Sequence, residues 1–258
     1  MAFHGRTALV TGAASGMGRL AALRLAAQGA RVAAVDLNEE GLGETAAHSA
    51  NIEIFPCDVS DRQQAEAVVA EVQSRLGPID RLTHAAAIMP GGSLVEMSTD
   101  QIIRLMEINY GGTVHLTKAV LPSMLERRSG DLILFGSMAG DVLTHHLGAY
   151  SATKAATNVY AEVLMRENRG SGIRFLLVCP PAVNTPLINQ ALDTGPESLR
   201  FSQRTGRLAR PEAILDAIER ALEKGRWVVR PGEATALTWL RRLSPGLLWW
   251  LMERANKL

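Results

Sequence analysis

Short apolar runs rich in β-branched residues alternate along the chain with longer segments of helical periodicity. The runs are TALVTG, RVAAVD, IEIFPCD, IDRLTHAA, GDLILFGS, IRFLLVCPP and RWVVRP, and the helical segments span 16–28, 61–75, 99–127, 149–168 and 211–223. Strands that are apolar almost throughout, each followed by a helical segment, indicate a parallel sheet covered on both faces. We therefore predict an α/β fold with a seven-stranded, doubly wound parallel sheet.

The composition fits one large domain. At 258 residues, with 47% hydrophobic and 21% charged residues, the chain can bury a substantial core as a single unit. Its formal net charge of +1 gives no electrostatic reason to expect nucleic acid as a partner. We expect one domain over residues 1–232 and a tryptophan-rich amphipathic tail over residues 233–258.

The cysteines and the start of the chain bear on its location. Cys57 and Cys179 follow apolar runs and are predicted to be buried thiols of a reducing compartment. The opening MAFHGRTALV lacks the basic start, long apolar stretch and cleavage site of a signal peptide. No segment reaches the ~18 uninterrupted apolar residues that a membrane-spanning helix needs. A cytoplasmic location is expected.

A glycine-rich turn, TGAASGMG, joins the first predicted strand to the first predicted helix at residues 11–18. Glycine at positions 12, 16 and 18 allows a tight turn and lets backbone N–H groups and the helix N-terminus approach a pyrophosphate. Because the turn lies between a strand and a helix, it predicts a dinucleotide site.

The second predicted strand ends at Asp36, where a carboxylate can accept hydrogen bonds from the adenosine ribose. Leu37 and Asn38 follow, so there is no arginine beside it to receive a 2′-phosphate, and the carboxylate would repel one. NAD is therefore favoured over NADP. Arg19 or Arg31 would reverse this preference if either turned towards the ribose. The alternative role for Asp36 is that of an ordinary helix N-cap.

The segment YSATK places Tyr150 and Lys154 four residues apart in a predicted helix, so the two side chains share a face. A free phenol with a pKa of about 10 is a poor base at neutral pH, and nearby positive charge favours the phenolate. Lys154, with the positive nicotinamide ring of an oxidised dinucleotide, would supply such charge. The pair therefore suits the proton transfer that accompanies hydride transfer, and Ser137 suits binding of the reacting oxygen.

In order and spacing, these motifs resemble the short-chain dehydrogenase/reductase family, in the subclass with TGxxxGxG and YxxxK. The resemblance runs from about Arg6 to Val229 and implies a Rossmann-like fold. It implies a catalytic group, which comprises Asn109, Ser137, Tyr150 and Lys154. By the same resemblance, Asn109 would hold a water in a proton relay to the lysine. Taken singly, three of these residues have plainer roles: a strand-end cap (Ser137), a helix kink (Asn109) and a solvated charge (Lys154).

The resemblance also implies further cofactor contacts and two departures from the family pattern. The contacts comprise Gly12, Ser15, Gly16, Met17 and Gly18 in the turn, Asp36 at the ribose, Asp58 and Val59 at the adenine, Ala85, Ala86, Ala87, Tyr150 and Lys154, and Pro180, Val183 and Thr185 near the carboxamide. The sequence His84-Ala-Ala-Ala replaces the family's Asn-Asn-Ala-Gly, and His84 is either a substitute donor or, as we favour, a packed core histidine. Pro181 replaces the family's glycine and stiffens the floor below the nicotinamide.

Positions that would face the substrate are mainly apolar. The predicted contacts comprise Ala139, His145, Leu147, Pro181 and Leu187, with Met138, His146 and Ile188 beside them. This lining favours a hydrophobic alcohol or ketone over a sugar, although the two histidines could face solvent instead. No metal site is predicted.

The tail TWLRRLSPGLLWWLMERANKL carries three of the four tryptophans beside Arg241, Arg242, Arg254 and Lys257. It could lie in a membrane interface, dock on a partner subunit or close over the pocket. Together with CPP and INYGG, it resembles the 3-ketosphinganine reductases, whose substrates are long-chain lipids.

The favoured function is that of an NAD-dependent oxidoreductase acting on an apolar secondary alcohol or its ketone. The alternatives are a reductase of a lipid-linked 3-oxo substrate at a membrane surface, a non-catalytic dinucleotide-binding protein and a structural subunit. The resemblance implies a homodimer or homotetramer formed through the helical segments 99–127 and 149–168.

Overall fold

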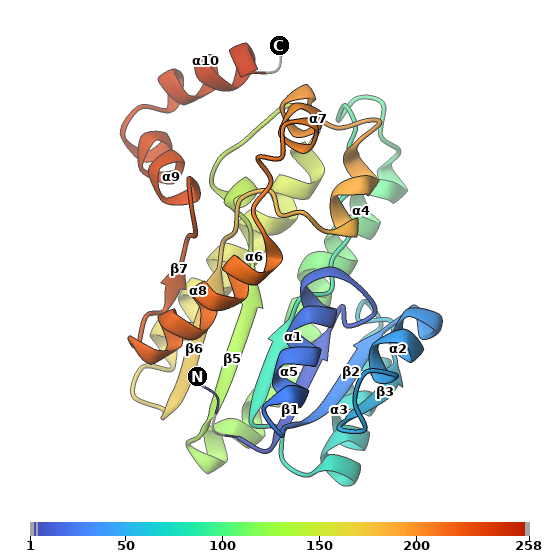
Figure 1. Cartoon of the computed structure of the whole chain (residues 1–258). Coiled ribbons are helices and arrows are strands. Elements are labelled where there is room, and N and C mark those ends of the chain that lie inside the picture. The colour runs from blue at the N-terminus through green and yellow to red at the C-terminus, as the bar shows by residue number, and fades with distance from the viewer. Residues whose placement is uncertain (1–2, 4, 256–258) are drawn as a thin grey trace.

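The computed structural model describes residue 3 and residues 5–255, and its centre is one seven-stranded parallel sheet (Figure 1). The strands are β1 (Thr7–Thr11), β2 (Arg31–Asp36), β3 (Ile52–Pro56), β4 (Arg81–His84), β5 (Gly130–Phe135), β6 (Ile173–Val178) and β7 (Val228–Val229). Their order in the sheet is β3-β2-β1-β4-β5-β6-β7, and every neighbouring pair is parallel. The predicted fold class and strand count are confirmed. The order reverses between β1 and β4, which is where such sheets bind ligands.

Helices connect the strands and continue to the C-terminus. They are α1 (Gly16–Ala27), α2 (Glu39–Ala46), α3 (Arg62–Leu76), α4 (Thr99–Met106), α5 (Gly112–Arg127), α6 (Gly148–Glu167), α7 (Glu197–Arg204), α8 (Pro211–Glu223), α9 (Ala234–Leu243) and α10 (Pro245–Ala255). Three shorter turns of helix are η1 (Glu107–Gly111), η2 (Met138–Gly140) and η3 (Pro186–Ala191).

Two apolar layers hold the sheet between these helices (Figure 1). On one face, α1 and α8 pack against side chains such as Val10 of β1 and Ile133 of β5. On the other face, α3, α5 and α6 pack against the alternate side chains, such as Leu9 and Leu132. Both faces of each central strand are therefore buried, which accounts for the near-continuous apolar runs in the sequence.

The segment predicted as one helix over residues 99–127 is divided. It consists of α4, the π-helical turn η1 and α5, and the fully buried Asn109 lies in the π-helical turn. A π-helical turn is a single widened turn, often found at functional sites, and hydrophobic periodicity does not reveal it. The short helices α2 and α7 were also not predicted.

The tail forms two helices, α9 and α10. Residue Ser244 separates them, and Pro245 begins α10, where a missing backbone N–H costs nothing. Lys257 and the other residues after 255 lie outside the described residues. Across the described part of the chain, no helix has both the length and the apolar character needed to cross a membrane. Cys57 and Cys179 are buried free thiols.

Candidate active site

The turn after β1 brings α1 close to the carboxyl end of the sheet. Gly12 and Gly16 have φ angles of 68° and 53°, in the left-handed region that favours glycine. A Cβ added to Gly12 would lie 2.9 Å from the backbone nitrogen of Ala86, and one added to Gly18 would collide with the carbonyl of Gly12. Glycine at these positions therefore lets the turn pack closely on the segment after β4 and lets α1 begin directly against the turn.

A groove with a cavity volume of about 380 Å³ runs along this end of the sheet. Its lining includes these residues predicted from the sequence: Gly12, Ser15, Gly16, Met17, Gly18, Asp36, Asp58, Val59, Ala85, Ala86, Ala87 and Thr185. It also includes residues that sequence reasoning missed or placed elsewhere: Leu37, Asn38, Ile88, Arg104, Ile108, Pro186, Leu187 and Gln190. Pro180 and Val183 are buried and do not line it.

The carboxylate at the end of β2 is held by backbone groups. Asp36 accepts hydrogen bonds from the backbone N–H of Ala14 at 3.1 Å and of Asn38 at 3.0 Å. The N-cap of α2 is Asn38, whose side chain accepts from Gly41. The alternative role of Asp36 as the N-cap of that helix is therefore not the one it takes.

Neither arginine that could favour a 2′-phosphate is turned towards Asp36. Arg19 donates to Glu44 at 2.7 Å and to the carbonyls of Gly41 and Ala14. Arg31 is the first residue of β2, at the opposite end of that strand from Asp36, and donates to backbone carbonyls at the end of α3. Both guanidinium groups are bonded to other acceptors, and neither forms an ion pair with Asp36.

The end of β4 is tied to β1 by a hydroxyl. Thr11 Oγ1 accepts from the backbone N–H groups of Ala85 and Ala86 at 3.2 Å each, so its own proton is available to His84 Nδ1 at 2.8 Å. The imidazole is buried, and burial, with the charge of Lys154, lowers the pKa of His84 to about 3. His84 is thus a neutral core histidine, as we favoured from the sequence.

Tyr150 and Lys154 lie one turn apart on α6, and Ser137 follows β5. The side chain of Ser137 acts on the phenol, because it opposes the rise in the pKa of Tyr150 that burial causes. Lys154 Nζ donates to the carbonyl of Phe135 at 2.8 Å and lies 5.8 Å from the centroid of the tyrosine ring. The structure therefore brings together three of the four residues predicted to be catalytic.

Burial dominates the protonation of this group. Burial raises the pKa of Tyr150 to about 12, against the opposing effect of the hydrogen bond from Ser137, and lowers the pKa of Lys154 to about 8. The sequence led us to expect that the lysine would favour the phenolate. In the protein alone, desolvation outweighs that effect, so the phenol keeps its proton at neutral pH and is suited to act as an acid.

Asn109 joins three elements through its side-chain amide. Its Oδ1 accepts from the backbone N–H of Ile88 at 2.9 Å, and its Nδ2 donates to the carbonyl of Ile88 at 2.9 Å and to Thr153 Oγ1 at 3.0 Å. Thr153 precedes Lys154 on α6. The amide therefore fixes the segment after β4 against α6, and the plainer role as a helix kink also applies because the residue lies in the π-helical turn.

Asn158 is a supporting residue that sequence reasoning missed. Its Nδ2 donates to the carbonyl of Ser137 at 3.2 Å. A Cβ added to Gly136 or Gly140 would collide with this amide, so those glycines make room for it. Asn158 follows Lys154 by four residues on α6, and a polar side chain on the same face as the lysine was the signal available in the sequence.

An apolar cluster covers Tyr150, which retains only 6% of its exposure. The cluster contains Met89, Leu147, Tyr150, Ile188, Ala191 and Leu199, with Ala139 and Leu187 packed against it. Three of the predicted substrate residues, Ala139, Leu147 and Leu187, thus gather around the phenol. Pro181 lies instead beside Gly232, at the residues that lead into α9.

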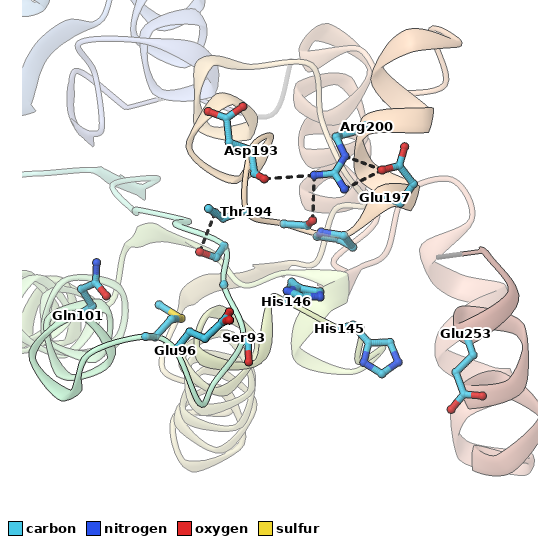
Figure 2. A pocket seen from close by; sticks show the side chains of 15 residues that line it. Ser93, Glu96, Gln101, His145, His146, Asp193, Thr194, Glu197, Arg200 and Glu253 are labelled. Carbon is cyan, nitrogen blue, oxygen red and sulfur yellow. Dashed lines mark hydrogen bonds and ion pairs between the residues drawn. The ribbon is translucent and has the colours of Figure 1, made fainter. Parts of the chain in front are cut away.

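A second cavity, of about 650 Å³, opens beside this cluster (Figure 2). It is lined by residues of three loops and of the helices α4, α7 and α10: Gly91, Gly92, Ser93, Glu96, Met97, Gln101, His145, His146, Asp193, Thr194, Gly195, Pro196, Glu197, Arg200 and Glu253. This lining is polar, in contrast to the apolar lining expected. Both histidines are exposed and face this cavity, and the ring of His145 also contacts Trp249.

Hydrogen bonds hold the segment after β6 against the segment after β4. The backbone N–H of Met89 donates to Gln190 Oε1 at 2.8 Å, and Thr194 Oγ1 donates to the carbonyl of Gly91 at 2.8 Å. Both segments contribute to the apolar cluster, with Met89 from one and Ile188 and Ala191 from the other.

Comparisons with known proteins agree with this geometry. The family model described as short chain dehydrogenase matches residues 6–195. D-threitol dehydrogenase from Mycolicibacterium smegmatis is 36% identical over 223 residues, which cover 83% of this chain and 84% of that protein. The 3-ketodihydrosphingosine reductase of Bos taurus is 31% identical over 236 residues, covering 88% of this chain and 71% of that protein.

Solved structures share the whole fold. A short chain dehydrogenase/reductase from Burkholderia phymatum, in complex with NAD, superposes with a TM-score of 0.84 at 26% identity. The superposition covers 96% of each chain.

Proposed function

Since the chain belongs to the short-chain dehydrogenase/reductase family of NAD(P)-dependent oxidoreductases, we propose that it interconverts an apolar secondary alcohol and its ketone using NAD(H). The observation that carries the proposal is the buried phenol of Tyr150, which lies one helical turn from Lys154 and whose pKa is affected by Ser137. The groove at the carboxyl end of the same sheet suits a dinucleotide. The domain that holds both sites spans residues 1–232, and residues 233–258 form the tail.

The residues of the groove fit a dinucleotide. Glycine at positions 12, 16 and 18, where an added Cβ would meet neighbouring protein atoms, lets the turn pack closely at the start of α1, and the N-terminus of that helix suits a pyrophosphate. We assign Asp36 to the adenosine ribose, Asp58 and Val59 to the adenine, Tyr150 and Lys154 to the nicotinamide ribose, and Ser15, Met17, Ala85, Ala86 and Ala87 to the length of the groove. Thr185 would bind the carboxamide, and Pro180 and Val183, which are buried outside the groove, belong to the same segment. When bound, the cofactor supplies or accepts the hydride.

Asp36 favours NAD over NADP. Its carboxylate is oriented by two backbone N–H groups. A 2′-phosphate beside it would meet an anion, and Arg19 and Arg31 are engaged elsewhere. Because like charges at close range repel by several kcal/mol in a partly buried site, the preference for NAD should exceed about tenfold.

The side chains around the phenol divide the proton chemistry among them. Ser137 would bind the reacting oxygen, and Tyr150 would donate its proton to that oxygen as the ketone is reduced. Lys154 would stabilise the phenolate that remains. Asn109 would position the lysine through Thr153 and hold the water of a relay that returns the proton.

The substrate class follows from the covering cluster. Apolar side chains surround the phenol, among them Ala139, Leu147 and Leu187, so apolar groups beside the reacting carbon would be bound. His145 and Pro181 would contact more distant parts of the substrate. One relative has a name that indicates a ketolipid, so a lipid-linked 3-oxo substrate is the second candidate, and the apolar cluster favours it over a polyol.

A direct assay tests the proposal. The absorbance of NADH and NADPH at about 340 nm would be followed with ketones of increasing apolar chain length. We expect oxidation of NADH that rises in kcat/KM with chain length, and at least about tenfold slower use of NADPH. Binding of NADH without turnover of any ketone or alcohol would instead support a non-catalytic dinucleotide-binding protein.

A homodimer or homotetramer located in the cytoplasm is also proposed. Exposed Val159 and Val163 of α6 lie beside the rings of Tyr110 and Tyr160, which meet edge to face where α6 meets the α4–α5 junction. An apolar face of this kind suits packing against a second copy. Light scattering after size-exclusion chromatography would give the mass, and a monomer would contradict the proposal.

A further inference from the structure

Helix α10 carries an apolar stripe that faces away from the protein. Leu247, Trp250, Leu251 and Arg254 recur at the spacing of one helical face, and all four are exposed. Trp250 retains 50% of its exposure. The opposite face is the one that packs on the domain, because Leu248 is 2% exposed and Trp249 contacts His145. The outward stripe therefore takes no part in packing α10 against the domain.

Helix α9 repeats this arrangement. Trp239 and Leu243 are 57% and 80% exposed, and Arg242 lies between them on the same face. The buried residues of this helix, Ala234 and Thr238, lie on its other side. Helices α9 and α10 contact each other and extend beyond the body of the domain (Figure 1). Large apolar side chains gathered in this way mark an interaction surface.

The basic residues of this surface are available for an external anion. Across residues 3 and 5–255, no carboxylate lies within ion-pair distance of Arg241, Arg242 or Arg254. The guanidinium of Arg242 lies 5.9 Å from the ring centroid of Trp239, and that of Arg254 lies 4.8 Å from the ring centroid of Trp250. Arg242 and Arg254 thus each stand over a tryptophan, and neither has a carboxylate partner among the described residues.

We propose that the outward faces of α9 and α10 dock on the headgroup region of an anionic lipid bilayer. The lipid-docking surface comprises Trp239, Arg242, Leu243, Leu247, Trp250, Leu251 and Arg254. Tryptophan is favoured at the boundary between headgroups and acyl chains, leucine enters the apolar side, and arginine pairs with anionic headgroups. A protein partner would need acidic groups beside an apolar face. An anionic bilayer presents negatively charged headgroups above an apolar interior at every point of its surface.

The surface lies next to the polar cavity. Glu253, on the inward side of α10, lines that cavity, and Trp249 of the same helix contacts His145 at its edge (Figure 2). A bilayer bound to the outward side of α10 would therefore lie close to the mouth of the cavity. The consequence that an apolar substrate enters from the membrane rests on the proposed function, whereas the docking itself does not.

The test measures binding of the full chain to vesicles and requires no turnover. Vesicles of phosphatidylcholine alone would be compared with vesicles that also contain phosphatidylserine, by sedimentation and by tryptophan emission. We expect binding and a blue shift only with phosphatidylserine, and weaker binding as salt is raised. Absence of binding to the anionic vesicles would overturn the proposal.

Two variants locate the binding on this surface. The triple change Leu247→Ser, Trp250→Ser and Leu251→Ser should abolish binding, and the double change Arg242→Glu and Arg254→Glu should weaken it on the order of tenfold or more. The double change Arg62→Glu and Arg166→Glu is the matched control, because it alters net charge equally at exposed arginines of α3 and α6. The control should bind like the parent protein.

Other outcomes would contradict the assignment. Equal loss in the control pair would show that net charge alone drives binding. A lower mass in solution for the triple variant would show that a second copy covers the surface. If the triple variant loses the circular dichroism spectrum of the parent, the double arginine variant decides alone, because exposed charges leave the core untouched.

Discussion

Desolvation governs the individual residues at the centre of the site. Tyr150 and Lys154 are both buried, and burial moves their pKa values in opposite directions, to about 12 and about 8. Each shift favours the uncharged form. The protein alone therefore holds a neutral phenol beside an ammonium group that titrates in the range of mildly alkaline pH.

The lysine shift predicts a pH-dependent stability. Between about pH 8 and pH 10.5 the unfolded chain binds a proton at Lys154 that the folded chain does not, so the stability of the wild type rises with pH. Below pH 8 both states are protonated and the cost of burying the charge is constant. In Lys154→Met this contribution is absent, so the variant's unfolding free energy relative to wild type should fall by about 3 kcal/mol across that window.

Urea denaturation of both cofactor-free proteins at a series of pH values measures the difference. Tyr150 titrates in both proteins, so subtracting the two curves removes its contribution. Parallel curves would mean that the ammonium group is not buried as the structure has it.

Asp36 predicts a change in cofactor preference. In the double change Asp36→Ser and Leu37→Arg, the repelling carboxylate is lost and a guanidinium is placed beside the ribose. The ratio of kcat/KM for NADPH to that for NADH should rise by about a hundredfold or more. An unchanged ratio would remove Asp36 from the ribose.

Among the elements, the junction of β1 and α1 is the most constrained. The Cα of Gly18 packs directly on the carbonyl of Gly12, so α1 can start close to the sheet only without a side chain there. In Gly18→Ala we expect NADH binding to fall by at least about tenfold and stability to fall by about 1–3 kcal/mol. Gly43→Ala in α2 is the control, because an added Cβ there meets nothing within 4 Å.

The control should bind NADH normally and gain up to about 1 kcal/mol, since alanine is the better helix former. Calorimetric titration and thermal melts give both quantities. Normal NADH binding by Gly18→Ala would show that the turn does not approach the pyrophosphate.

An element could be predicted from the sequence when the residues that determine it lie close together in the chain. The buried strands and the long helices show their periodicity within a dozen residues, so all seven strands and the helices α1, α3, α6 and α8 were predicted close to their observed bounds. The π-helical turn at Asn109 and the amide of Asn158 depend on contacts with distant segments. Hydrophobic periodicity within a segment does not reveal such contacts.

The residues that the loops contribute to the site were also hard to predict from the sequence. The polar cavity is formed by segments that lie far apart in the chain, after β4, after β5 and after β6, with α10 added. Residues such as Glu96 and Glu253 have no pattern that links them. The apolar residues around Tyr150 were foreseeable because they flank motifs, whereas Gln190 joins the site through a single hydrogen bond to Met89.

At the scale of the whole molecule, the two ends of the sheet have different roles. The carboxyl ends of the strands carry the candidate site, while the amino ends are joined by a buried ion network. Asp131 of β5 accepts from Arg81 of β4 at 2.8 Å and from Arg174 of β6 at 2.6 Å, and Arg81 also pairs with Glu219 of α8. The network thus links three strands and one helix far from the groove.

Removal of the central carboxylate should destabilise the fold. Asp131→Ala would leave the guanidinium of Arg81 buried without its main partner, which costs about 3–5 kcal/mol. The exposed pair of Arg24 and Asp216 is the control, and Asp216→Ala should cost less than about 1 kcal/mol. Urea denaturation measures both, and equal small losses would mean that the buried pair contributes no more than a surface one.

The phenol is the central claim, and Tyr150→Phe tests it most directly. The change removes one hydroxyl from a buried ring, so NADH binding and the fold should persist. With the ketone that the wild type reduces fastest, kcat should fall by about 10²–10⁴-fold, the range for loss of a general acid. A variant that binds NADH and retains wild-type kcat would contradict the assignment of proton transfer to Tyr150.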